Sequence, residues 1–527
     1  MAWLRTDDVS LAPGGRLLAE HVTFRVDPGD RIGLIGPNGM GKTSLFRLLR
    51  AEYLPEQGQV ERSDDVVIAS LDQLGRIADG TVWDIAFGSH LELPQMQEAM
   101  RTLEARMADP DCDDLEHVLE EYAHIQERFI EADGYAWDAR VRQTLMGAGI
   151  PESRFGDSPN TLSGGEHHRL ALATVVLSGA NLWLLDEPTN HLDIQAIEWL
   201  EDVLVHFPGA VVMASHDRRF LERTATRIMT WEDGFFWMVT GSYRRYLALR
   251  DERRQTTAQA WQRYQEERAR LMAYVDRYRA GNRATQAKSR LHTIARLDAQ
   301  AAKPAARART DPSRLAHRGQ EMSGTHALVV NDLVLQREER TWLPLSFKLP
   351  AAARLGIVGP NGSGKTTLIR ALVGTDAGVR WNQDAVVSWY DQEAAALLPS
   401  DETGLRLAND EGMDKETAFH LGARFGLTPD LLDTRTATWS GGERSRLALL
   451  FALMSRSTVL VLDEPTNHLD LPMREELEEL LTGYPGAVIL VSHDRELVDN
   501  VATHMLWWEG GDFHFRPGRY SEVVGRA

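Results

Sequence analysis

Short apolar runs and longer helical periodicities alternate along this chain of 527 residues. The runs Leu182–Leu185 and Ala210–Ala214 contain no charged residue and are shorter than an ordinary helix. Fully apolar segments of this length are typical of strands in a parallel sheet that is buried on both faces. The pattern therefore predicts an α/β fold with a central parallel sheet.

Residues 93–134 carry a helical periodicity instead. Apolar residues recur there at intervals of three and four, on either side of an aspartate-rich turn: Met96, Met100, Leu103, Met107, then Leu115, Val118, Tyr122, Ile125 and Phe129. Pro94 suits the first turn of a helix, and Gly134 is expected as the C-cap of the second helix. The spacing predicts an inserted hairpin of two antiparallel helices.

A second helical hairpin is predicted within residues 244–318. One seam steps at alternating intervals of three and four through Trp261, Tyr264, Arg268, Leu271, Val275 and Tyr278. Gly281-Asn282 interrupts it, and a returning helix is marked by Ala284, Ala287, Leu291 and Ile294. The Ala/Arg/Pro-rich stretch 301–313 is expected to be an extended tether.

The chemical motifs of the chain occur twice, in the same order. The two sets read GPNGMGKT and GPNGSGKT (36–43, 359–366), then a glutamine (Gln73, Gln392), SGGE (163–166, 440–443), LDEPTNHLD (185–193, 462–470) and SHDR (215–218, 492–495). Ser163 precedes Asp186 by 23 residues, as Ser440 precedes Asp463, and Glu187 precedes His216 by 29, as Glu464 precedes His493. Equal spacings predict two domains of one fold, at 1–243 and 319–527, joined by the linker 244–318.

These motifs resemble those of the ATP-binding cassette superfamily, and the resemblance covers nearly the whole chain. In a phosphate loop, glycines let backbone N–H groups surround phosphate oxygens at a helix N-terminus, and the lysine reaches the outer phosphates. The expected nucleotide-binding residues are Gly36, Asn38, Gly39, Gly41, Lys42, Thr43 and Ser44 in the first copy and Gly359, Asn361, Gly362, Gly364, Lys365, Thr366 and Thr367 in the second.

The resemblance also implies roles for the remaining motifs. Mg²⁺ is expected near Thr43, Gln73 and Asp186 in the first copy and near Thr366, Gln392 and Asp463 in the second. Glu187 and Glu464 resemble the general base that polarises the attacking water, and His216 and His493 would contact the terminal phosphate. These are the expected catalytic residues of an ATPase.

The SGGE segments are expected to open helices that cap the ATP held by the opposite domain. The resemblance implies a head-to-tail pairing, in which Ser440, Gly441 and Gly442 close over ATP on Lys42. Ser163, Gly164 and Gly165 would close over ATP on Lys365.

Neither LAPGG (11–15) nor LQREE (335–339) supplies the aromatic residue on which the family stacks adenine, although Trp342 lies close. The preference for ATP over GTP therefore stays open.

Composition narrows the class of protein. No apolar run approaches the roughly 18 residues of a membrane helix, the N-terminus lacks a signal-peptide core, and the single cysteine, Cys112, excludes an internal disulfide. A cytoplasmic, monomeric protein is expected, with its two cassettes paired within one chain.

The net charge is −19, but residues 244–318 carry 19 Lys/Arg against 7 Asp/Glu, so the rest of the chain carries −31. Such sorting of charge favours a nucleic-acid contact at the linker.

Two cassettes, an inserted arm and a basic linker together resemble the ABC-F family of translation factors. The linker string RYRAGNRATQAKSRLHTIARL resembles the tRNA-interaction hairpin of that family. The resemblance implies ribosome binding near the tRNA exit site in the ATP-bound form, with release after hydrolysis. Contact with tRNA and rRNA is expected from Arg277, Arg279, Arg283, Lys288 and Arg290.

Several alternatives stay open at this stage. The acidic hairpin 93–134 is either a solvated helix pair or an arm for a basic partner. The linker tip is short, which favours a general translation role over protection against antibiotics. An ATPase subunit of a membrane transporter would explain the cassettes but not the basic linker. A DNA-repair ATPase would require zinc-binding cysteines or very long coiled coils, which this chain lacks.

Overall fold

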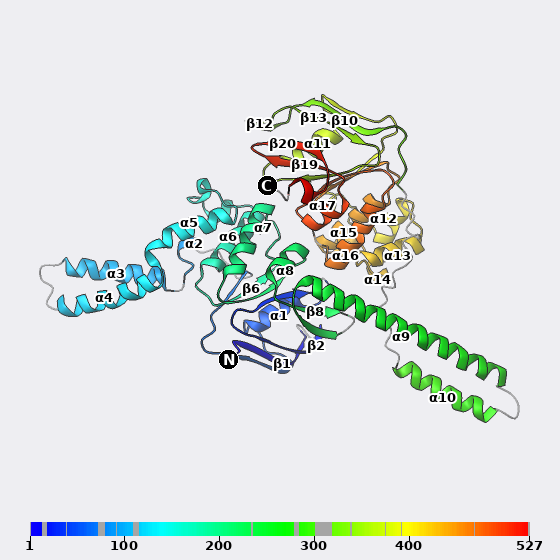
Figure 1. Ribbon diagram of the computed structural model, residues 1–527, viewed down its shortest axis with the longest axis horizontal. Helices are drawn as coiled ribbons and strands as arrows, with labels where there is room; N and C mark the ends of the chain where they lie inside the picture. The colour runs from blue at the N-terminus through cyan, green and yellow to red at the C-terminus, as the bar shows by residue number, and fades with distance from the viewer. Residues whose placement is uncertain are drawn as a thin grey trace.

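The computed structural model of the protein has two cassettes of the same topology, an arm and a linker (Figure 1). It describes residues 2–12, 18–37, 39–71, 80–90, 92–108, 115–232, 235–278, 284–300, 319–337, 340–374, 376–391, 393–467 and 469–524. The expected fold class, two α/β cassettes joined by a helical hairpin with an arm in the first, is confirmed. None of the helices in these ranges combines the length and the apolar composition that crossing a bilayer requires.

Each cassette is built on a six-stranded sheet. In the first, the spatial order is β5 (Ile68–Ser70), β6 (Leu182–Asp186), β7 (Ala210–Ala214), β3 (Arg31–Ile35), β8 (Arg227–Glu232) and β9 (Phe235–Thr240). In the second it is β16 (Val387–Tyr390), β17 (Val459–Asp463), β18 (Ala487–Val491), β14 (Arg354–Val358), β19 (His504–Glu509) and β20 (Asp512–Pro517). All neighbours are parallel except the last pair. The central strands are buried, as their apolar sequences predicted.

Smaller antiparallel sheets complete both cassettes. Their strands are β1 (Leu4–Leu11), β2 (Ala19–Val26) and β4 (Gln57–Arg62) in the first, and β10 (His326–Leu333), β13 (Leu345–Pro350) and β15 (Val379–Trp381) in the second, with a short ribbon of β11 (Gln336–Arg337) and β12 (Arg340–Thr341). Their apolar faces share a hydrophobic core with the main sheets. Each small sheet therefore covers one side of its six-stranded sheet.

Helices cover the remaining surfaces. In the first cassette they are α1 (Lys42–Leu49), α2 (Val82–Phe87), α5 (Trp137–Gly147), α6 (Gly164–Leu177), α7 (Ile194–His206) and α8 (Arg218–Thr224). In the second they are α11 (Lys365–Val373), α12 (Gly404–Asp410), α13 (Lys415–Arg424), α14 (Pro429–Leu432), α15 (Gly441–Met454), α16 (Leu471–Thr482), α17 (Arg495–Val501) and α18 (Tyr520–Val523). Short 3-10 turns lie at Gly134–Ala136, Glu152–Arg154, Pro159–Thr161 and Thr436–Thr438.

The arm projects from the first cassette as α3 (Leu93–Met107) and α4 (Leu115–Glu131), drawn in cyan in Figure 1. Both predicted helices are present, and Pro94 lies in the first turn of α3. The prediction that Gly134 is a C-cap is wrong. Asp133 takes the left-handed conformation instead, with φ +57°, and Gly134 begins a 3-10 turn. Gly134 is needed for close approach, because a Cβ there would lie 2.5 Å from the Phe129 ring.

The linker helices α9 (Tyr243–Tyr278) and α10 (Ala284–Gln300) project away from the arm (Figure 1). Leu271, Val275 and Ile294 form a small buried cluster between them. Asp298 on α10 accepts hydrogen bonds from Tyr264 Oη (2.5 Å) and from Arg268 Nε (3.1 Å) on α9. The predicted seam therefore does hold the two helices together.

Reciprocal contacts join the two cassettes. Leu471 of the second cassette is buried in the core of the first, and Ile194 of the first packs against the core of the second. Arg218 donates to Glu478 across the interface (2.9 Å), and Arg495 donates to Glu201 in the opposite direction. These pairs come from equivalent positions of the two copies, so a pseudo-twofold axis relates them.

Replacing Arg495 by methionine is expected to lower the free energy of unfolding by about 3–5 kcal/mol, the usual cost of breaking a buried ion pair by removing one partner. Glu201 is 1% exposed and would lose one of its two arginine partners. Denaturant unfolding measures the effect. The control is Arg142→Ala, whose ion pair with Glu152 is about half exposed and should contribute less than about 1 kcal/mol. Equal losses in the two variants would contradict the prediction.

Candidate functional site: two phosphate-binding loops and their strand ends

The first phosphate loop connects the end of β3 to α1. Gly39 and Gly41 take left-handed backbone conformations, with φ +81° and +95°, which only glycine adopts without strain. Lys42 is 8% exposed, and its Nζ donates to the carbonyl oxygen of Gly36 at 3.0 Å. A Cβ added at Gly39 would meet no atom within 4 Å, so space lies beside the loop.

The second phosphate loop has the same geometry. Gly362 and Gly364 have φ +79° and +96°, and α11 begins at Lys365. Lys365 Nζ donates to the carbonyl oxygens of Gly359 (2.8 Å) and Pro360 (3.1 Å). Thr366 and Thr367 follow in the first turn of α11, as Thr43 and Ser44 follow Lys42 in α1.

The ends of β6 and β7 bring the expected catalytic residues beside the first loop. Thr43 Oγ1 donates to Asp186 Oδ2 at 2.5 Å. Lys42 Nζ lies 2.6 Å from His216 Nε2 and 3.6 Å from Glu187 Oε1. Glu187 Oε1 and His216 Nε2 are 3.1 Å apart. The sequence motifs thus meet at the carboxyl edge of the sheet, where parallel α/β proteins bind their ligands.

Burial governs the protonation of this cluster. It raises the pKa of Glu187 to about 7, against the opposing influence of Lys42. Burial also lowers the pKa of Lys42, and it lowers the pKa of His216 well below its usual range, which the charge of Lys42 reinforces. His216 is therefore neutral, and it lies beside Lys42 and Glu187 without adding a positive charge to the cluster.

The second site repeats these contacts with small differences. Thr366 Oγ1 donates to Asp463 Oδ2 at 3.0 Å, and the backbone N–H of His493 donates to Glu464 Oε2 at 3.2 Å. Burial raises the pKa of Glu464 and lowers that of His493 to about 3. The hydrogen bonds of Lys365 Nζ go to carbonyl oxygens of its loop, whereas Lys42 Nζ also lies within hydrogen-bond distance of His216.

Both glutamates have strained backbones. Glu187 and Glu464 have φ +48° and +50°, values that are uncommon for residues other than glycine. Each backbone N–H donates to the neighbouring strand, from Glu187 to Ala214 (2.8 Å) and from Glu464 to Val491 (2.9 Å). Strain held in place by its surroundings is typical of functional sites.

The SGGE segments open helices, as predicted. Ser163 caps α6 and Ser440 caps α15, and each forms a capping box with a glutamate three residues on, Glu166 or Glu443. Gly164 and Gly441 have no atom within 4 Å of an added Cβ, and Gly165 lies beside His191. The glycine directly after each serine, Gly164 or Gly441, therefore leaves the helix N-terminus open to an anion.

One contact links these elements across the cassettes. The backbone N–H of Asn361, in the second phosphate loop, donates to Asp193 Oδ2 of the first cassette at 3.1 Å, and its side chain donates to the carbonyl of His191 at 3.4 Å. In the reverse direction, the negative charge of Asp470 in the second cassette opposes the burial that lowers the pKa of Lys42. Each phosphate loop is thus met by the loop that ends LDEPTNHLD in the other copy.

The residues present fit a magnesium nucleotide. A cavity of ≈ 520 Å³ is lined by Leu18, Gly39, Gly41, Lys42, Thr43, Ser44, Leu71, His168, Asp186 and Glu187. It combines glycines of the phosphate loop, a buried cation and a hydroxyl–carboxylate pair. Mg²⁺ typically takes one or two such protein oxygens and completes its shell with phosphates and water.

Trp342 packs against the second phosphate loop. It is 5% exposed, its Nε1 donates to the carbonyl of Ser363, and its ring lies against Gly364. Leu18 lies in the corresponding place against Gly41 and lines the first cavity. At the first site, Leu18 therefore offers a base an apolar contact and not an aromatic stack.

Some expected residues lie outside the described ranges, namely Asn38, Gln73, Gln392, Arg279 and Arg283, as do the side chains of Arg277 and Lys288. Arg290 is described: it is exposed on α10, and its guanidinium lies 5.8 Å from the ring centre of Tyr274 on α9. A cation beside an aromatic ring is a pairing that nucleic-acid surfaces use.

Comparison with known proteins agrees with this architecture. A family model described as ABC transporter matches residues 19–190 and 343–467, and a second with the same description matches residues 230–313. The chain is 31% identical to the energy-dependent translational throttle protein EttA of Mycobacterium tuberculosis, over 96% of this chain and 91% of EttA. It is 29% identical to ABC transporter F family member 5 of Arabidopsis thaliana, over 98% of this chain and 76% of that protein.

The chain belongs to the ABC-F family. As an ABC-F protein with two complete cassettes, it is an ATPase. Its fold is similar to that of archaeal ABCE1, solved in complex with the ribosomal stalk protein aP1, with a TM-score of 0.63, 17% identity and coverage of 98% and 91% of the two chains. At this identity the similarity shows the fold alone.

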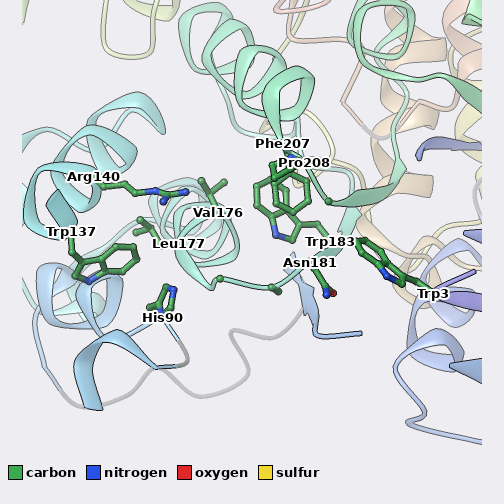
Figure 2. A pocket seen from close by; sticks show the side chains of 13 residues that line it. Trp3, His90, Trp137, Arg140, Val176, Leu177, Asn181, Trp183, Phe207 and Pro208 are labelled. Carbon is green, nitrogen blue, oxygen red and sulfur yellow. The ribbon is translucent and has the colours of Figure 1, made fainter. Parts of the chain in front are cut away.

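A second cavity, of ≈ 330 Å³, lies at the opposite end of the first ABC-F cassette (Figure 2). Aromatic side chains line it, including Trp137, Trp183 and Phe207, with Arg140 at its edge. Trp183 stacks on Phe207 with ring centres 3.6 Å apart. Because Trp183 lies near the start of β6, this cavity is at the amino ends of the strands, away from the phosphate loop.

Sequence reasoning missed several residues of the ABC-F sites. Asp193 and Asp470 end the LDEPTNHLD motifs, but the motif alone gave no sign that each acts on the opposite cassette. His168 and Leu71 line the first cavity, although only their proximity to SGGE and Gln73 marked them in the sequence.

Proposed function

We propose that the protein is a translation factor that binds the ribosome near the tRNA exit site in its ATP-bound form, contacts tRNA and rRNA through its basic linker, and leaves after hydrolysis. The observation that carries this proposal is the concentration of positive charge in residues 244–318 of an otherwise acidic chain. The printed name of EttA, a translational throttle, supports it. The short linker tip favours a general role in translation over protection against antibiotics.

Sedimentation with ribosomes tests the proposal. The protein should pellet with ribosomes in the presence of a non-hydrolysable ATP analogue and stay in the supernatant with ADP. A transporter subunit would not pellet with ribosomes under either condition. Equal ribosome binding with the ATP analogue and with ADP would contradict the ATP-dependent cycle, but it would still support ribosome association.

At each ATP site, the chain's own residues divide the work. Lys42 and Lys365, with the loop N–H groups, hold the triphosphate, and the hydroxyl–carboxylate pairs Thr43–Asp186 and Thr366–Asp463 hold Mg²⁺, joined by Gln73 and Gln392. When bound, the metal ion neutralises charge on the phosphate oxygens. Glu187 and Glu464 accept the proton of the attacking water, and His216 and His493 contact the terminal phosphate.

We propose boundaries of 1–243 and 319–527 for the cassettes, with the arm at about 93–134. Within this pair, Ser440, Gly441 and Gly442 close over ATP on Lys42, and Ser163, Gly164 and Gly165 close over ATP on Lys365. The hydrogen bond from Asn361 to Asp193 supports this pairing, since it sets the loops of the first cassette against the second phosphate loop. The arm, with its acidic surface, is the contact for a basic ribosomal partner.

Replacing Ser440 by a bulky residue such as phenylalanine is expected to impair the site of Lys42 more than the site of Lys365. The bulky side chain would obstruct the helix N-terminus that closes over the first nucleotide. Measuring ATP turnover in the Lys365→Ala and Lys42→Ala backgrounds separates the two sites, and Ser163→Phe should show the opposite preference. Full activity from a separately expressed first cassette would contradict the shared sites.

A further inference from the structure

The cavity at the amino ends of the strands of the first cassette has aromatic walls on two sides. Figure 2 shows Trp137, from the start of α5, on one side and the stacked pair of Trp183 and Phe207 on the other. Its volume of ≈ 330 Å³ lies at the lower end of the range of small-molecule sites, about 300–1,000 Å³. Walls of this kind suit a flat apolar group.

Arg140 supplies a positive charge at the edge of this cavity. It is exposed on α5, and none of the described residues forms an ion pair or hydrogen bond with its side chain. Arg142, two residues further along the same helix, is instead paired with Glu152 at 2.8 Å. A cation without a carboxylate partner can bind an anion without first breaking an ion pair.

His90 supplies a hydrogen-bond donor whose tautomer is fixed by the arm. Its Nδ1 accepts from the backbone N–H groups of Glu92 and Leu93, both at 3.1 Å, at the start of α3. Burial lowers the pKa of His90, and the charge of Arg140 reinforces this, so the ring is neutral and its proton is on Nε2. An added Cβ at Gly179, which also lines the cavity, would lie 2.7 Å from Nε2. The Nε2–H group is therefore at the cavity wall.

Trp183 adds a second N–H group to the wall. Its side chain is 3% exposed, and its Nε1 has no hydrogen-bond partner among the described residues. The amide of Asn181 is already satisfied, because its Nδ2 donates to the carbonyl of Asp65 and its Oδ1 accepts from the N–H of Val67, both at 2.8 Å. The polar side chains left in the lining are donors, which fits a ligand that carries acceptor atoms.

The second cassette fills the equivalent place with its own chain. Phe207 corresponds to Tyr484, which is 2% exposed and donates from Oη to the carbonyl of Ser457 at 2.7 Å. Gly319 packs on the Tyr484 ring, since an added Cβ there would lie 2.6 Å from it. The N–H of Gln320 donates to the same carbonyl of Ser457 at 2.9 Å. The cavity is therefore a feature of the first cassette and not a requirement of the fold.

We propose that this cavity binds a small aromatic anion, an aryl carboxylate or an aryl phosphate. The ring lies between the aromatic walls, and the anionic group faces Arg140 and the Nε2–H group of His90. Burial of the ring removes apolar surface from water, and a charge-assisted hydrogen bond recognises the anion. The site is separate from the ATP site of the same cassette, because the two lie at opposite ends of the same strands.

Ligand-detected NMR titration of the full chain tests the proposal, with both ATP sites saturated by a non-hydrolysable ATP analogue and Mg²⁺. Phenyl phosphate and benzoate are the probes, and at least one should bind, with one molecule per chain. The tighter of the two identifies the anionic group. Inorganic phosphate lacks the ring and benzylamine has the opposite charge, so neither should displace the bound probe. Equal binding of benzylamine, or no binding of either aryl anion, would overturn the proposal.

Variants locate the binding in this cavity. Arg140→Met should raise the Kd of the tighter probe about three- to tenfold, the scale of one partly screened charge, and Arg140→Glu should abolish binding. Trp183→Phe keeps an aromatic ring beside Phe207, removes the indole N–H and should also weaken binding. Arg142→Met is the matched control on the same helix and should leave the Kd unchanged. Parent affinity in Arg140→Glu, or an equal effect of Arg142→Met, would show that the probe binds elsewhere.

Discussion

The double variant Glu187→Gln with Glu464→Gln is expected to bind ATP normally and to hydrolyse it about 10²–10⁴-fold more slowly, the usual contribution of a general base. Glutamine has the shape of glutamate but cannot accept the proton of the attacking water. Both side chains are largely buried at the carboxyl ends of β6 and β17, beside the lysines of the phosphate loops. Phosphate release measured beside equilibrium ATP binding gives the result.

The fold should survive this change. Burial raises the pKa of both carboxyl groups, which means that the protein environment disfavours their charged forms. A neutral amide at these positions therefore adds no buried charge. The single variants report each site separately, and Glu152→Gln, at an exposed position, is the control. Turnover near the native rate in the double variant would show that these glutamates are not the bases.

Replacing Arg277, Arg279, Arg283, Lys288 and Arg290 with alanine is expected to weaken ribosome or tRNA binding strongly while leaving basal ATP hydrolysis intact. Phosphate contacts release counterions, so affinity falls with salt, and each lost contact should make the logarithmic salt dependence shallower by about one unit. Arg290 is exposed on α10, so its loss leaves no buried group without a partner. Binding across a salt series, wild type against variant, measures both effects.

A variant with the same loss of charge elsewhere separates local contact from net charge. Arg5, Arg25, Arg101, Arg142 and Arg406 all have side chains that are more than half exposed, on the cassettes and the arm. Their replacement by alanine should change the affinity far less than the linker variant does. An unchanged slope and affinity in the linker variant would mean that the linker tip is only a solvated helix end.

The sequence by itself determined the elements and the local geometry of each site. The apolar runs became the buried strands β6 and β7, and the three-and-four spacings became the helices of the arm and the linker. Motif glycines took left-handed conformations, and the serines of SGGE capped helices. Such features depend on contacts between residues close in the chain, so residue type and spacing encode them.

Two local patterns did not give the structure. Asp133, and not Gly134, takes the left-handed conformation after α4, and Gly134 is required instead because a Cβ there would meet the Phe129 ring. Trp342 is near the phosphate loop in sequence, but its indole N–H is held by Ser363 and its ring by Gly364. In both cases the packing of an aromatic ring decides the local arrangement, which the spacing of residues in the sequence does not show.

Only the tertiary structure decided which surfaces of the two copies meet. Nothing in LDEPTNHLD indicates that Asp193 accepts from Asn361, 168 residues away, or that Arg495 pairs with Glu201 across the interface. A repeated sequence encodes two equal sites, but the pseudo-twofold packing places different neighbours beside each, and electrostatic forces act through space without regard to chain order.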